Sequence, residues 1–330
     1  MIPARAFCQA QKRAIGFLAL FISRDADVDA LAHQPPQMAK ANGIELCYET
    51  FGTLDAEPLV LIMGLGAQMI HWDDEFCRDL ASRGFRVIRF DNRDIGKSTR
   101  MSGGKPLRPI ELLKLRIFKI APEAPYKLWD MARDVVGLLD ALGISKAHIV
   151  GASMGGMIAQ EIAMQYPDRV LSLTSIMSST GNPKLPQATR EASAILLAPP
   201  PTTKAEYIER FGQTWKVLRG GSFPLDEAKD RERAERTYAR GLNPAGVGRQ
   251  LRAILASGSR KDRLGSVRAP TLVIHGTIDP LVRMEAGKDT AASIPGAKLL
   301  LVEGMGHALP IPMWPTIIGA IAEHAKNARR

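Results

Sequence analysis

Short apolar runs alternate with helical patterns along most of this chain of 330 residues. Each run is rich in aliphatic and β-branched residues and ends at glycine or polar residues, which is typical of a buried strand. The runs lie at 44–51, 59–63, 86–90, 147–150, 171–176, 271–275 and 299–302. Alternating strands and helices predict an α/β fold, in which helices cover both faces of a mostly parallel central sheet.

One of these runs leads directly into a serine flanked by glycines. Ser153 is the centre of the sequence GASMG, a GxSxG element, and helix-forming residues follow as far as Gln165. A sharp turn from strand to helix exposes the serine hydroxyl above the sheet and aims a backbone amide at developing negative charge. A serine becomes a nucleophile when a base takes its proton and donors hold the oxyanion. Ser153 is therefore a candidate nucleophile, and a glycine-rich turn between core elements is the structural alternative.

An acid and a histidine follow Ser153 at the ends of later strands. Asp279 lies in the turn after the run at 271–275, and His307 lies in the turn after the run at 299–302. The carboxyl ends of parallel strands share one edge of a sheet, where ligands bind. We therefore expect Ser153, Asp279 and His307 to meet there as nucleophile, orienting acid and base, in the chain order of the α/β-hydrolase arrangement.

The chain resembles the α/β-hydrolase fold family from about residue 43 to residue 325. The segment LVLIMGLG at 59–66 resembles the family's strand and oxyanion turn, and DNRDIGKS at 91–98 resembles its DxRGxGxS turn. The resemblance implies that the backbone amides of Leu65 and Met154 hold the oxyanion, and that Asp91 and Arg93 brace the turn behind the site. Asp94 departs from the pattern, which usually has glycine there.

Within the family, the segments MGLGAQMIHWDDEF, RVIRFDNRDIGKST and EGMGHALP are most similar to the aclacinomycin methylesterase-like group. This resemblance implies a carboxylic ester hydrolase that needs no cofactor and acts on a small-molecule ester. The same scaffold supports other reactions, so a lactonase, a proline iminopeptidase-like amidase and a carbon–carbon bond hydrolase remain alternatives. A ligand receptor without catalytic activity is a further alternative from a different class.

The pattern of elements divides the chain into three parts. Residues 1–37 are expected to form an N-terminal extension, and residues 38–180 with 268–330 the hydrolase core. Between them, 181–267 has Pro-punctuated helical patterns at 191–197, 204–218 and 226–238. This insertion falls between nucleophile and acid, where the family carries its cap, or lid, so the resemblance implies a helical cap over the site. Its inner surface is expected to select the acyl and alcohol groups of the substrate.

Apolar side chains near the active turns suggest an adaptable substrate pocket. The expected pocket residues are Met69, Trp72, Met157 and Leu309, with ordinary core packing as the alternative for the methionines. Two charged segments are expected to face solvent instead. Asp134 and Asp140 are predicted on the solvated face of a helix at 129–142, and the mixed-charge run at 229–233 predicts a solvated helix face.

Composition excludes several other classes of function. The net charge is +10, but acids alternate with bases and no one-signed patch with stacking aromatics is visible, so nucleic-acid binding is not expected. No metal-ligand spacing and no run long enough to span a membrane occurs.

Three cysteines suggest reduced thiols and a cytoplasmic location. Residues 14–22, after three basic residues, resemble a secretory signal, so export or a membrane-surface anchor is the alternative to an appended helix or an over-long start. The sequence carries no signal for an oligomeric state.

Overall fold

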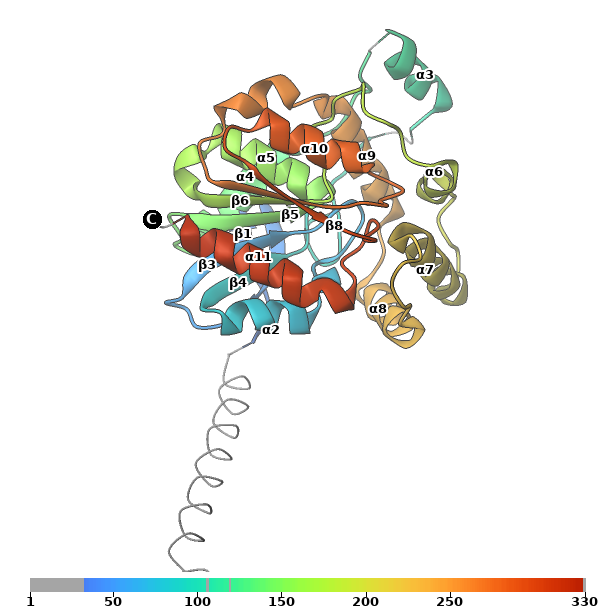
Figure 1. Ribbon diagram of the computed structural model, residues 1–330. Coiled ribbons are helices and arrows are strands. Elements are labelled where there is room, and N and C mark those ends of the chain that lie inside the picture. The colour runs from blue at the N-terminus through green and yellow to red at the C-terminus, as the bar shows by residue number, and fades with distance from the viewer. Residues whose placement is uncertain (1–32, 105–106, 119, 329–330) are drawn as a thin grey trace, which may run out of the picture.

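A mixed sheet of eight strands forms the centre of the computed structural model, which describes residues 33–104, 107–118 and 120–328 (Figure 1). The strands are β1 Gln34–Ala41, β2 Ile44–Phe51, β3 Glu57–Ile62, β4 Phe85–Phe90, β5 Ala147–Ala152, β6 Val170–Ile176, β7 Thr271–Gly276 and β8 Lys298–Val302. Their order across the sheet is β1-β2-β4-β3-β5-β6-β7-β8. The two pairings of β2, with β1 and with β4, are antiparallel, and the others are parallel, as the alternating pattern predicts.

Helices cover both faces of this sheet. The helices are α2 Asp74–Ser82, α3 Pro109–Phe118, α4 Leu128–Ala141, α5 Met154–Gln165, α6 Arg190–Leu197, α7 Lys204–Arg219, α8 Glu227–Arg240, α9 Pro244–Ser257, α10 Met284–Ser293 and α11 Trp314–Asn327, with 3-10 turns at η1 Met69–His71, η2 Pro167–Arg169, η3 Lys261–Ser266 and η4 Ile311–Met313. In Figure 1, α4, α5 and α10 lie on one face of the sheet and α2 and α11 on the other.

The central strands are buried on both sides, which explains their unbroken apolar runs. In β3, Leu59 and Leu61 pack in the apolar cluster beneath α2 and α11, whereas Val60 and Ile62 pack in the cluster beneath α4 and α5. Successive side chains of a strand point to opposite faces, so a strand covered twice needs apolar residues at every position.

The first strand crosses the boundary expected at residue 37. β1 begins at Gln34 and pairs with β2 at the edge of the sheet, with an irregularity in its register between Gln34 and Gln37. Pro35 and Pro36 occupy that irregularity and donate no backbone hydrogen bond, which an edge strand tolerates. The signal-like segment at 14–22 lies outside the described residues. Within the described ranges, no helix is long and apolar enough to cross a membrane.

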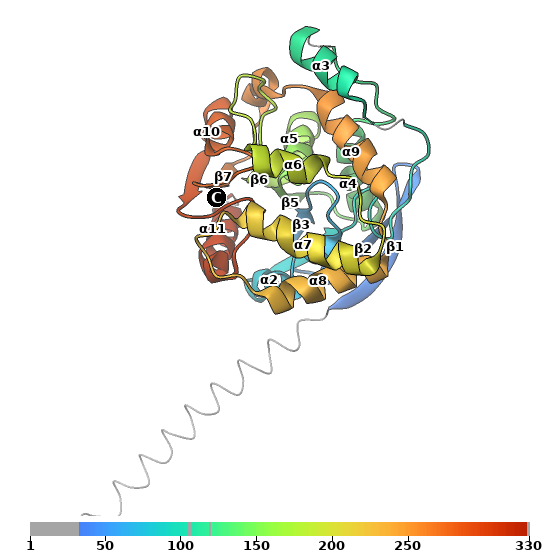
Figure 2. The same ribbon diagram turned by 90° about the vertical axis from the view of Figure 1, so that its right-hand side faces the viewer.

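The segment from 181 to 267, here called the cap segment, contains α6 to α9. Figures 1 and 2 show α6, α7 and α8 lying across one end of the sheet. The helical patterns at 191–197, 204–218 and 226–238 correspond to α6, α7 and α8. α9 has no counterpart among the predicted helices, because Pro244, Gly246 and Gly248 give its first turns the composition of a loop. Pro244 instead occupies the first turn, and Asn243 caps it through its side chain.

The prediction that Asp134 faces solvent is wrong. Asp134 lies on α4 but is only 2% exposed, and its two carboxylate oxygens accept hydrogen bonds from Nε and Nη2 of Arg93, both at 2.6 Å. Asn42 Nδ2 donates to the same carboxylate at 2.9 Å. The helical period alone does not reveal this, because a partner 41 residues away in the sequence makes the inward-facing acid favourable.

We expect Asp134→Ala to lower the free energy of unfolding by about 3–5 kcal/mol, because Arg93 would keep a buried charge without its partner. Asp140→Ala on the same helix is the matched control. Its ion pair with Arg169 is on the surface, so the loss should stay within about 1 kcal/mol. Urea unfolding of both variants measures the difference, and equal losses would contradict the burial argument.

Candidate active site

The backbone around Ser153 turns so tightly that only glycine fits two residues before it and two residues after it. Ser153 lies between the end of β5 and the start of α5, with φ 56° and ψ −119°. A Cβ on Gly151 would lie 2.1 Å from the Gly155 carbonyl oxygen, and one on Gly155 would lie 2.1 Å from the Ile62 oxygen. Ser153 is a non-glycine residue with a positive φ, which is a strained conformation. The close packing of Gly151 and Gly155 on either side holds it in place. The GxSxG spacing is therefore a steric requirement of this turn.

The structure brings Ser153, His307 and Asp279 together. His307 Nε2 lies 2.9 Å from Ser153 Oγ, and His307 Nδ1 lies 2.7 Å from Asp279 Oδ2. The other oxygen of Asp279 accepts from the backbone amides of Leu281 and Val282, at 2.9 and 2.8 Å. A carboxylate only accepts, so the proton resides on Nδ1 and Nε2 is free to accept the serine proton. The arrangement can activate a hydroxyl.

The topology explains why residues so distant in sequence meet. Ser153 follows β5, Asp279 follows β7 and His307 follows β8, and all three strands are parallel. The turn that carries Asp279 and the turn that carries His307 are also hydrogen-bonded to each other. Thr277 Oγ1 accepts from the Gly304 amide at 2.9 Å, and the Ile278 amide donates to the Met305 carbonyl at 3.2 Å. These bonds fix the spacing of the two turns independently of their catalytic side chains.

The turn after β3 lies against the nucleophile. A Cβ on Gly64 would lie 3.1 Å from Ser153 Cβ, so Leu65 follows at the point of closest approach. Met154 is the first residue of α5, and the first amides of a helix have no acceptor within it. Both positions are compatible with the prediction that the Leu65 and Met154 amides hold an oxyanion.

The cap segment bonds to the turns that carry the candidate residues. The His307 amide donates to the Leu218 carbonyl at 2.6 Å, and the Thr189 amide donates to the Pro280 carbonyl at 2.8 Å. A Cβ on Gly306 would lie 2.3 Å from the Leu218 oxygen, so the end of α7 packs directly on the histidine turn. The cap segment and the site therefore form one packed structure.

A cavity of about 440 Å³ lies between the cap segment and the sheet and includes Ser153 and His307 in its lining. Of the residues expected in the pocket, Trp72 and Leu309 line it, as does Leu65. Met69 and Met157 are not among the described residues that line the cavity. Met69 is fully buried in η1 and packs with Cys47 and Ile70, and Met157 faces the core from the first turn of α5. Sequence proximity to the active turns does not determine which way these side chains point.

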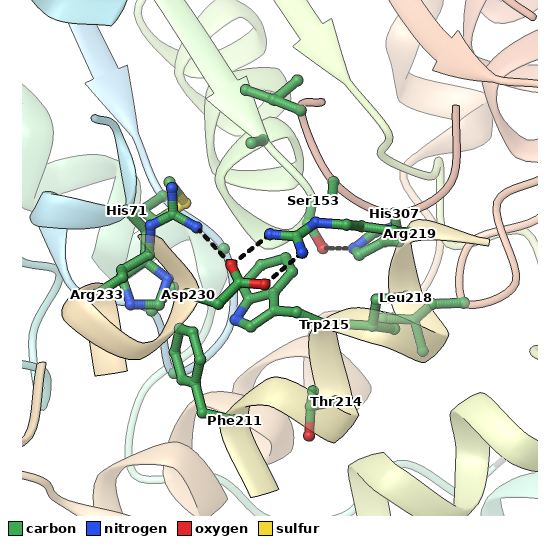
Figure 3. A pocket seen from close by; sticks show the side chains of 18 of the residues that line it. His71, Ser153, Phe211, Thr214, Trp215, Leu218, Arg219, Asp230, Arg233 and His307 are labelled. Atoms are coloured by element: carbon green, nitrogen blue, oxygen red, sulfur yellow. Dashed lines mark hydrogen bonds and ion pairs between the residues drawn. The ribbon is translucent and has the colours of Figure 1, made fainter. Parts of the chain in front are cut away.

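One wall of the cavity is aromatic. The rings of Phe211 and Trp215 on α7 lie 5.7 and 6.0 Å from the ring of His71, measured between centroids (Figure 3). Burial and the nearby Arg233 lower the pKa of His71 to about 3, so its ring is neutral in the physiological range. His71 donates to or accepts from Thr237 Oγ1 at 3.1 Å through Nε2. It lines the pocket, and in the described structure no hydrogen bond joins it to Ser153, His307 or Asp279.

Another wall is formed by alternating charges. Arg219 at the end of α7 binds both oxygens of Asp230 on α8, each at 2.5 Å, and Arg233 contacts Asp230 at 3.4 Å (Figure 3). Arg233 also binds Asp73 at 2.7 and 2.9 Å. The prediction that the run at 229–233 faces solvent is therefore wrong for Asp230 and Arg233. The inward face could have been found from the helical spacing of Asp230, Ala234 and Thr237, which are all buried.

We expect Gly306→Ala to lower turnover at Ser153 by on the order of 10²-fold, because the added Cβ must displace either the end of α7 or the His307 turn. Gly212→Ala in α7 is the control, since a Cβ there meets nothing within 4 Å. Steady-state kinetics together with circular dichroism test this. Unchanged kcat in folded Gly306→Ala would contradict the tight packing.

The family resemblance is confirmed by comparison with known proteins. The rhodomycin D methylesterase DauP of Streptomyces sp. (strain C5) is 30% identical over 315 residues, which cover 89% of this chain and 99% of that protein. The rhodomycin D methylesterase DnrP of Streptomyces peucetius is 29% identical with the same coverage. A solved hydrolase from Pseudomonas aeruginosa PA01 has a TM-score of 0.65 at 24% identity, covering 88% of this chain and 98% of that one. The family model for the alpha/beta hydrolase fold matches residues 57–312, and the protein therefore belongs to that family.

Proposed function

We propose that the protein is a serine hydrolase that cleaves carboxylic esters through an acyl-enzyme intermediate. The observation that carries this proposal is the pair of hydrogen bonds that joins Ser153 Oγ to His307 Nε2 at 2.9 Å and His307 Nδ1 to Asp279 Oδ2 at 2.7 Å. The methylesterases that are about 30% identical over most of the chain support an ester as the substrate.

In the first half of the reaction, Ser153 Oγ forms a bond to the acyl carbon while His307 Nε2 takes the hydroxyl proton. The carbonyl electron pair moves onto oxygen, and the amides of Leu65 and Met154 donate to the resulting oxyanion. The carbonyl then re-forms and the bond to the alcohol oxygen breaks. The imidazolium returns its proton to that oxygen, so the alcohol leaves neutral.

In the second half, a water molecule takes the place of the alcohol. His307 accepts a proton from water as its oxygen attacks the acyl carbon, and the same oxyanion donors act again. Collapse breaks the bond to Ser153 Oγ, which recovers its proton from His307, and the acid is released. Asp279 stays ionised throughout, holds the imidazole in the useful tautomer and stabilises the imidazolium.

The cavity favours an ester whose acyl part is bulky and largely apolar. Its volume of about 440 Å³ is far larger than methanol requires, and aromatic and aliphatic side chains make up much of the lining. In the charged wall, Arg219 is paired with Asp230 and Arg233 with Asp73, so the positive and negative charges of these pairs cancel. This wall therefore adds a preference for a neutral polar substituent on the substrate. We therefore propose small-alcohol esters of aromatic or otherwise bulky acids, with methyl esters first.

A substrate panel tests the class of reaction. Methyl esters of acetic, benzoic and naphthoic acid should show kcat/KM rising by at least about tenfold along the series, because burial of a ring contributes about 1.5–3 kcal/mol. Lactones, prolyl amides and 1,3-diketones test the alternative reactions on the same residues. Ser153→Ala is the blank, and a fluorophosphonate should label Ser153 in the wild type. Labelling of Ser153 without turnover of any ester would overturn the ester assignment. The absence of both labelling and turnover would favour a receptor.

We expect Asp279→Asn to lower kcat on the order of 10⁴-fold, the loss known for the corresponding change in a serine protease, because an amide stabilises the wrong imidazole tautomer. Asp289→Asn, on α10 and away from the site, should keep wild-type kcat. Stopped assays at saturating ester, with circular dichroism to verify folding, measure both. A fall of less than tenfold would exclude the orienting role of Asp279.

A further inference from the structure

Helix α9 of the cap segment turns three buried polar side chains toward the core. Arg249, Gln250 and Arg252 are at most 8% exposed, and each binds a partner outside the cap segment. Arg252 binds Glu111 and the Glu123 carbonyl, Arg249 binds Asp94, and Gln250 binds the turn after β3. Buried polar groups need such partners, so the position of α9 is fixed by the groups it meets.

Asp94 is the anchor for α9. Its backbone has φ 73°, the left-handed conformation that favours glycine, and its carboxylate is fully buried. The carboxylate accepts from Tyr126 Oη at 2.7 Å, the Met101 amide at 2.8 Å, and Arg249 Nε and Nη2 at 2.9 and 2.6 Å. Asp94 thus adopts the backbone conformation that glycine has at this position of the family turn, and it adds an ion pair with Arg249 of α9.

Gln250 connects α9 by a hydrogen bond to the turn that carries Leu65. Its Oε1 accepts from the Gly66 amide and its Nε2 donates to the Arg93 carbonyl, both at 2.9 Å. Only one orientation of the side-chain amide satisfies both partners, and the side chain is fully buried. Val247, one turn earlier on α9, packs on the same glycine, because a Cβ on Gly66 would lie 3.1 Å from it.

The direction of the Leu65 amide depends on two peptide planes. The first contains the Gly64 carbonyl and the Leu65 N–H, and the Ala67 amide holds it through a bond of 3.3 Å to the Gly64 oxygen. The second contains the Leu65 carbonyl and the Gly66 N–H, and Gln250 holds it at 2.9 Å. Planar peptides leave only φ and ψ of Leu65 free between them. The shorter of the two restraints comes from the cap segment.

We propose that Gln250 is a positioning residue that holds the oxyanion turn, so that the Leu65 amide points at the reacting oxygen only while α9 is seated on the core. This inference rests on the proposed function. It assigns part of the catalytic geometry to a cap residue that does not line the cavity in the described structure and does not touch the reacting atoms. The cap segment therefore acts on kcat as well as on the choice of substrate.

The test compares Gln250→Met with Gln250→Glu on the best ester of the panel. Methionine keeps the volume but removes both hydrogen bonds, so kcat should fall on the order of 10- to 100-fold, at or below the roughly 10²- to 10³-fold loss seen when an oxyanion donor is removed outright. KM should change by less than about threefold. Burial favours the neutral acid form of a glutamic acid at this site, which can accept from Gly66 and donate to Arg93, so Gln250→Glu should retain most of kcat.

Two further measurements separate positioning from simple loss of stability. A trifluoromethyl ketone forms a tetrahedral adduct with a reactive serine, and its affinity should fall in Gln250→Met by the same factor as kcat/KM. Gln160→Met is the matched control, because Gln160 is equally buried, bonds to Arg260 and Ser175, and lies on α5 away from the oxyanion turn. This variant should lose stability in urea but keep kcat.

The outcomes distinguish the inference from the proposed function. Wild-type kcat and ketone affinity in folded Gln250→Met, or an equal fall in Gln250→Glu, would overturn the inference alone. If Gln250→Met does not fold, Gln250→Glu and Gln160→Met decide it, since a large loss of kcat in either would contradict the positioning role. Absence of Ser153-dependent hydrolysis in the wild type would overturn the proposed function, and the inference with it.

Discussion

The contact on which the site depends is the approach of α5 to the end of β3. With only hydrogen at Gly155, the first turn of α5 can rest on the Ile62 carbonyl, and with only hydrogen at Gly151 the chain can reverse directly from strand to helix. Ser153 is held at φ 56° because the backbone packs tightly at Gly151 before it and at Gly155 after it. The hydroxyl is thus placed by backbone packing, before any hydrogen bond to His307 is considered. The parallel sheet then brings the acid and base turns to the same edge.

Charged pairs join the turn at 91–98 to the rest of the molecule. Asp91 binds Arg240 of α8, Arg93 binds Asp134 of α4, and Asp94 binds Arg249 of α9. Buried ion pairs contribute little net stability compared with apolar contacts, but loss of one partner is costly. Their effect here is to define one arrangement of helices around the turn. This arrangement places α8 and α9 against the segment that carries Leu65.

Much of the fold and the proposed catalytic residues could be predicted from local patterns. The strand runs and the GxSxG turn are visible because burial on both faces and steric closure leave direct marks on the sequence. The order of Ser153, Asp279 and His307 then locates the site. Contacts between distant segments leave no such mark. The burial of Asp134 depends on Arg93, 41 residues earlier in the chain, so this aspartate resembles an ordinary surface residue of a helix.

Met69 and Met157 illustrate the same limit for the pocket. Both are close in sequence to active turns, but their orientation is set by the helical turns on which they lie. Gln250 carries no motif at all, and its importance emerges only when the amide of Gly66 is traced to its acceptor.

The seat of Val247 on Gly66 has a consequence for chimeric enzymes. If a cap transplanted from a relative placed a residue bulkier than Val247 at this position, that residue would meet the backbone of Gly66, which cannot move aside as a side chain can. Specificity grafts in this scaffold should therefore exchange the loop at 64–68 and the helix together, as a single unit.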